Sequence, residues 1–151
     1  LHGANRLACN SLLEAMVFSH RCFIASMSEL PMTTIEKNIP DWNAEGTTAP
    51  NEMILITQSI KELKMLMSDY LGIVRNNERL IRATKRLDLL HEETEALYEK
   101  TKVSPQLCEL RNMITVAYLV VKSAEFRKES RGLHFNTDYP QKNPIIQNTI
   151  L

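Results

Sequence analysis

A loop of small residues with one arginine leads into a helix start near the beginning of the chain. Residues 3–14 read GANRLACNSLLE, and both Asn10 and Ser11 are residue types that cap the first backbone N–H groups of a helix. A helix start has unpaired N–H donors and a partial positive charge, which suit an anion or an electron-rich carbonyl group of a cofactor. Arg6 can bind a carboxylate there through two parallel hydrogen bonds. The pattern favours an anion site, although a lone arginine is usually a surface residue.

A second polar run lies near the other end of the chain, where residues 127–140 read RKESRGLHFNTDYP. An Arg-Gly-x-His run that leaves a helix usually makes C-capping and interdomain hydrogen bonds, and positive charge is favourable at that helix end. We therefore expect a structural role for Arg131 and His134. The sequence shows no Ser-His-Asp arrangement, no paired-carboxylate site and no metal-ligand spacing. We expect no catalytic residue and no metal site in this chain.

The composition limits the classes of function. The chain has 151 residues, of which 44% are hydrophobic and 24% charged, the usual balance of a globular domain. Lysine plus arginine equals 18 and aspartate plus glutamate equals 18, which argues against nucleic acid or anionic lipid as the main partner. No apolar run of about 18 residues occurs, so we expect no membrane span. Three scattered cysteines favour a reducing compartment, and we expect a cytoplasmic protein.

The first motif leads into a helix that is predicted to begin at Asn10 or Ser11 and to end near residues 27–29. Its apolar residues recur at three- and four-residue steps and form one broad face. Residues 30–51 contain prolines and a glycine that interrupt any helical period. A structureless link of this length is unusual inside one compact domain, so we expect a connector between two domains.

Three more helices are predicted between residues 52 and 130. Their ends carry the usual signals, which are Gly72 after the second helix, Asn76 or Asn77 before the third, and Ser104-Pro105 at the fourth. The predicted inner faces are Met53, Ile56, Ile60, Leu63, Met67 and Leu71; Leu80, Ala83, Leu87, Leu90, Thr94 and Leu97; and Leu110, Met113, Ala117, Val120, Val121 and Ala124. Short connections make neighbouring helices antiparallel. The sequence thus predicts an all-α fold with an antiparallel three-helix bundle at 52–131 and an extended or partly disordered tail at 132–151.

Both polar motifs resemble those of the succinate dehydrogenase and fumarate reductase flavoprotein superfamily. Residues 3–14 resemble its flavin-contacting stretch, and residues 127–140 are similar to the signature that follows its last helix. Leu133 after the glycine and the Asp138-Tyr139-Pro140 ending are similar to the L-aspartate oxidase branch. The resemblance covers nearly the whole chain, with two specific terminal motifs and a generic bundle between them.

This resemblance implies that residues 1–29 are the end of an FAD-binding domain. It implies that Arg6 binds a carboxylate of a dicarboxylic substrate, and that Ser11 and Leu12 contact the pyrimidine edge of the flavin. The whole protein would then convert L-aspartate to iminoaspartate, for quinolinate and NAD synthesis. Oxygen or fumarate would reoxidise its reduced flavin, and quinolinate synthase would be a candidate partner.

Two other functions fit parts of the sequence. A succinate dehydrogenase or fumarate reductase flavoprotein would keep the same arginine and use a different hydride donor. A non-catalytic helical interaction module would explain residues 52–130 equally well, but it would leave both terminal motifs as coincidences.

The opening residues read as the middle of a longer protein, without an initiator methionine or a signal-peptide pattern. The G-x-G-x-x-G fingerprint of a dinucleotide-binding domain is absent, so we expect this chain alone to lack FAD and to be inactive. The helix at 11–27 would expose the apolar residues Leu13, Val17, Phe23 and Ile24. We expect self-association, or folding onto the bundle, to cover this face.

Overall fold

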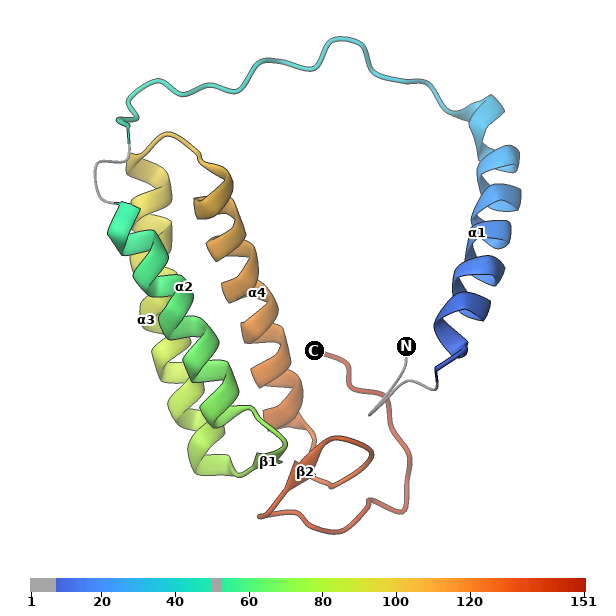
Figure 1. Cartoon of the computed structure of the whole chain (residues 1–151), viewed down its shortest axis with the longest axis vertical. Coiled ribbons are helices and arrows are strands. Elements are labelled where there is room, and N and C mark those ends of the chain that lie inside the picture. The colour runs from blue at the N-terminus through green and yellow to red at the C-terminus, as the bar shows by residue number, and fades with distance from the viewer. Residues whose placement is uncertain (1–7, 50–52) are drawn as a thin grey trace. The chain divides into compact units, whose positions relative to one another are not determined.

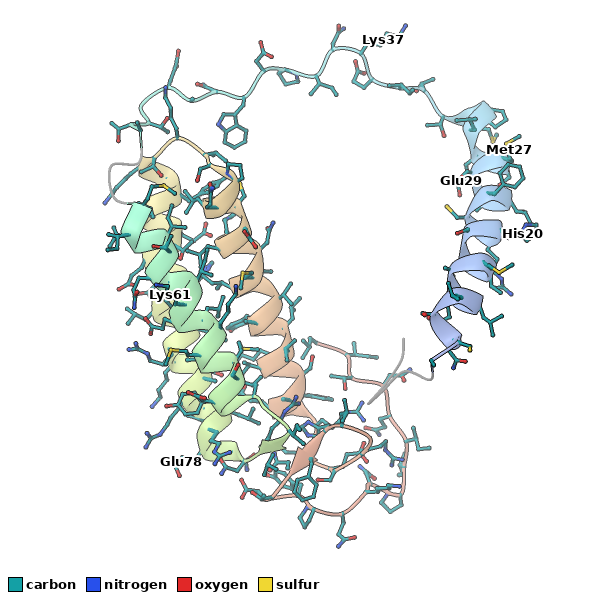
Figure 2. All side chains as sticks on the ribbon, in the orientation of Figure 1. His20, Met27, Glu29, Lys37, Lys61 and Glu78 are labelled. Atoms are coloured by element: carbon teal, nitrogen blue, oxygen red, sulfur yellow. The ribbon has the colours of Figure 1, made fainter. Side chains whose placement is uncertain are left out.

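The computed structural model describes residues 8–49 and 53–151, and the chain divides into two units, Leu1–Asn43 and Ala44–Leu151 (Figure 1). The first unit contains helix α1, Asn10–Glu29, and a short 3-10 helix, η1, Leu30–Met32. No residue of α1 is buried, and Figure 2 shows side chains such as His20 and Met27 projecting from it. The helix therefore presents its apolar residues without a covering layer in the described part of its unit.

The second unit is built on three helices that lie side by side in Figure 1: α2 at Met53–Tyr70, α3 at Asn77–Lys100 and α4 at Pro105–Phe126. Short connections join them, so neighbours run antiparallel, and the predicted all-α fold is confirmed. One cluster of buried apolar residues holds the bundle together: Ile56, Leu63, Leu66, Leu71, Leu80, Ala83, Leu87, Leu90, Leu107, Leu110, Ile114, Ala117, Val121 and Ala124. No helix in the described ranges is long and apolar enough to cross a membrane.

The ends of the bundle helices follow from local chemistry. Asn76 begins α3, because its side chain accepts a hydrogen bond of 2.8 Å from the backbone N–H of Arg79. Ser104 does the same for α4 at 3.2 Å, and Pro105 occupies the first helical position. At Gly72, a Cβ atom would lie 2.8 Å from the carbonyl oxygen of Ser68, so the turn after α2 has room only for glycine. These three sequence predictions are confirmed.

The tail after α4 is tied to the bundle. Strand β1, Val74–Arg75, pairs in parallel with strand β2, Phe135–Asn136, and this pair joins the α2–α3 turn to the tail. The backbone of Thr137 also donates to the carbonyl oxygen of Arg75 at 2.9 Å. The sequence predicted an extended or partly disordered tail and did not predict this small sheet, which depends on segments that are distant in the chain.

Candidate functional site

The start of α1 is the place where the sequence predicted cofactor contacts. The helix begins at Asn10, and Cys9 precedes it without any side-chain hydrogen bond to the helix start. The predicted cap at Asn10 or Ser11 is therefore wrong, because the helix already includes both residues. Ser11 is half-buried and Leu12 is 71% exposed. The side chain of Cys9 thus does not cap the first N–H groups of α1, and N–H groups at a helix start suit an electron-rich group.

The predicted substrate residue, Arg6, lies outside the residues that the structure describes. Its role therefore stays a prediction. Within residues 8–49 and 53–151, no three His, Cys, Asp or Glu side chains are placed to hold a metal ion.

A second polar site lies where the tail leaves α4, and Glu129 is at its centre. Its side chain is 7% exposed, and its Oε1 accepts a hydrogen bond of 2.9 Å from Nη1 of Arg127. Its Oε2 accepts from Nε of Arg131 and from the backbone N–H of Asn143, both at 2.9 Å. The bond from Asn143, followed by the bond and charge of Arg131, holds the pKa of Glu129 below its ordinary value. One buried carboxylate thereby binds Arg127, Arg131 and Asn143 together.

His134 connects the same region to the α2–α3 turn. Its Nε2 lies 3.1 Å from the carbonyl oxygen of Arg127, the residue after α4, and its Nδ1 lies 3.2 Å from Nη1 of Arg75. A carbonyl oxygen only accepts and a guanidinium only donates, so the ring is neutral with its proton on Nε2. Burial is the main cause that lowers the pKa of His134, and the charges of Arg75 and Arg127 lower it further.

These contacts agree with the structural role predicted for Arg131 and His134. His134 bonds to the carbonyl oxygen of Arg127, the first residue after α4, and Arg131 pairs with Glu129. Sequence reasoning missed Glu129 itself. The signal was present in the alternation Arg127, Glu129, Arg131, because side chains two residues apart in an extended segment lie on one face.

Acid should destabilise the bundle in two steps. Between pH 6.5 and the lowered pKa of His134, the unfolded chain binds a proton that the folded chain excludes, so the free energy of unfolding falls. Below pH 4.5 the same argument applies to Glu129, whose lowered folded pKa stabilises the fold only while the carboxylate is charged. Denaturant unfolding followed by circular dichroism from about pH 2 to about pH 8 would measure both steps.

The variant His134→Gln should remove the step just below pH 6.5 and keep the step of Glu129. His20→Gln, which replaces an exposed histidine of α1, is the matched control and should keep both steps. A first step that persists in His134→Gln would contradict the assignment.

Comparison with known proteins decides the family. The family described as "Fumarate reductase flavoprotein C-term" matches residues 60–145, which include most of α2, all of α3 and α4, and the Glu129 region. The chain belongs to this family. The match covers most of the three-helix bundle and the first part of the tail. The α1 motif lies outside it.

Individual relatives extend the likeness to all 151 residues of this chain. "L-aspartate oxidase" from Pseudomonas aeruginosa is 45% identical over 151 residues, which are 100% of this chain and 28% of that protein. "L-aspartate oxidase" from Yersinia pestis is 42% identical over the same shares of both chains. "L-aspartate oxidase 2-b, chloroplastic" from Nicotiana tabacum is 43% identical over 93% of this chain and 24% of its own. The chain therefore spans about 28% of the length of the bacterial relatives.

Proposed function

We propose that this chain is the C-terminal portion of an FAD-dependent L-aspartate oxidase. The observation that carries the proposal is the 45% identity to a protein named "L-aspartate oxidase" across all 151 residues. The match covers residues 3–14 as well as the bundle, so it supports one origin for both motifs. The proposed reaction of the whole protein is conversion of L-aspartate to iminoaspartate, which serves quinolinate and NAD synthesis.

The start of α1 fits a flavin. The side chain of Cys9 does not cap its first N–H groups, and the exposed Leu12 offers an apolar surface beside them. We assign Ser11 and Leu12 to the pyrimidine edge of FAD, where the partial positive charge of the helix start favours negative charge. When bound in the whole protein, FAD would supply hydride acceptance from the substrate Cα and electron transfer to oxygen or fumarate.

Arg6 is the residue that we assign to substrate. Its guanidinium would bind a carboxylate of L-aspartate through two hydrogen bonds and orient the Cα–H bond. No residue of this chain is assigned as an acid or base, and the remaining catalytic groups are expected in other parts of the protein.

The proposal is tested by mixing the whole purified protein with L-aspartate or with succinate under anaerobic conditions. L-aspartate should bleach the visible absorbance of the oxidised flavin, because the amino acid donates the hydride. Bleaching by succinate alone would identify a succinate dehydrogenase or fumarate reductase flavoprotein instead. Bleaching by neither, with FAD bound, would overturn the assignment to this reaction class.

The apolar face of α1 supports self-association of the 151-residue chain. Leu13, Val17, Phe23 and Ile24 are each more than half exposed, and a surface of this kind is usually covered in a stable protein. Sedimentation velocity should show a species larger than a monomer, and the pair Val17→Asp and Phe23→Asp should shift it toward the monomer. The matched control is Ile35→Asp together with Ile39→Asp, exposed positions in the connector that should leave the size unchanged. A wild-type monomer with α1 formed would contradict this proposal.

Two further assignments rest on the proposed function. Quinolinate synthase is the partner that would consume iminoaspartate, and the cytoplasm is the proposed compartment. Co-sedimentation of the whole protein with quinolinate synthase would test the first assignment.

A further inference from the structure

A pocket of about 330 Å³ lies where α4, the α2–α3 turn and the C-terminal tail meet. Its lining includes the polar side chains of Arg75, Arg127, His134 and Thr149. It also includes apolar residues of α4, where Val116, Leu119 and Val120 are 60%, 51% and 39% exposed. A cavity with a few convergent donors and an apolar wall is the usual form of a small-molecule site.

Arg75 enters this pocket with donor capacity to spare. Its Nε donates to the carbonyl oxygen of Gly72 at 3.0 Å, and its Nη1 donates to His134 at 3.2 Å. Among the described residues no carboxylate pairs with Arg75, and Nη2 donates to none of them. Burial lowers the pKa of this guanidinium, and a bound anion would offset the cost of that burial.

Thr149 supplies the second donor. Its Oγ1 accepts hydrogen bonds from both Nε and Nη2 of Arg127, at 3.2 and 2.8 Å. With its oxygen occupied in this way, the hydroxyl proton is the part of the group that is left to bind a ligand. Arg127 already has a carboxylate partner, because its Nη1 donates to Glu129, and its Nη2 donates to Gln147 and Thr149. Of the two arginines that line this pocket, Arg127 pairs with Glu129, and Arg75 pairs with no carboxylate among the described residues.

We propose that this pocket binds a carboxylate carried on a small apolar body. Arg75 Nη2 and the Thr149 hydroxyl donate to the carboxylate, and Val116, Leu119 and Val120 contact the apolar body. His134 is neutral and already donates to a carbonyl oxygen, so its role is to position Arg75. The site is independent of the reaction proposed above, because none of the residues assigned to FAD or L-aspartate contributes to it.

Benzoate is a suitable probe, and benzamide, which has the same shape without the charge, is its matched control. Titration of the ¹⁵N-labelled 151-residue chain should show saturable shifts with benzoate at the Arg75 Nε–H and the Thr149 amide. Benzamide should produce no saturable shift at these groups. Absence of saturation with benzoate, or equal binding of benzamide, would overturn the proposal.

Three variants locate the binding. Arg75→Gln should weaken benzoate binding at least about tenfold, since a charged hydrogen bond is lost. Thr149→Val replaces a half-buried hydroxyl of the tail that lies outside the buried apolar cluster, and it should weaken binding about fivefold. Arg82→Gln replaces an exposed arginine that pairs with Glu78 on the α3 surface, and it should bind as tightly as the unchanged chain. Unchanged binding in Thr149→Val would contradict the geometry even if Arg75→Gln were misfolded.

Discussion

Replacing Arg6 by leucine in the whole protein is expected to lower kcat/KM for L-aspartate by at least about 100-fold. Leucine has a similar bulk but donates no hydrogen bond, so the substrate carboxylate would enter the site without its charged partner. Steady-state oxidation of L-aspartate measures the effect, and flavin absorbance checks that the variant still binds FAD. If Arg6 only positions substrate, FAD content should stay unchanged while kcat/KM falls.

The control for this prediction is Arg21→Leu, which makes the same exchange at an exposed arginine of α1. It should retain turnover, because the surface charge of Arg21 has no assigned part in binding. Arg6→Lys adds a second comparison: it keeps the charge but loses the paired donors of the guanidinium, so its activity should fall between the other two. Unchanged turnover in Arg6→Leu would exclude the proposed substrate contact.

Leu87→Ala should lower the free energy of unfolding of the bundle by about 2 to 5 kcal/mol. Leu87 is 0% exposed and lies in the middle of α3 inside the apolar cluster, so truncation removes buried contacts and leaves a cavity. For a domain with a typical stability of about 5 to 15 kcal/mol, this is a large share. Denaturant unfolding of the 151-residue chain followed by circular dichroism measures the change.

Leu89→Ala is the matched control, since it makes the same exchange two residues along the same helix. Leu89 is 43% exposed, and its loss should change the free energy of unfolding by less than about 1 kcal/mol. Equal destabilisation by the two variants would mean that the α3 face that packs inward has been assigned wrongly.

Sequence periodicity was a good guide to α3 and a poorer guide to α4. All of the predicted inner positions of α3 from Leu80 to Thr94 are buried. On α4, Val120 was predicted to face inward but is 39% exposed, whereas Leu107 and Ile114 are buried and were not predicted. The reason is physical: α3 is rich in charged residues, so its apolar residues mark one face, while α4 is apolar around much of its circumference.

Local residues predicted the position of the candidate cofactor site, but they did not predict how its helix begins. Periodicity and residue types predicted that a helix starts near Asn10, yet the expected side-chain cap is not formed. Capping requires the residue before the helix to be extended, and Cys9 instead has helical backbone angles, with φ −89° and ψ −14°. Local sequence cannot distinguish the extended from the helical conformation of the residue before α1, because the same run of residues is compatible with both.

By itself, the sequence determined the helices, the ends of α3 and α4 and the character of the two terminal motifs, because these depend on interactions within a few residues. Tertiary structure decided the contacts of the tail. Arg75 and His134 are far apart in the chain and hydrogen-bonded in space, and the Glu129 carboxylate joins Arg127 to Asn143. Only the antiparallel packing of α2, α3 and α4, which returns the chain to the α2–α3 turn, brings these polar groups within bonding distance.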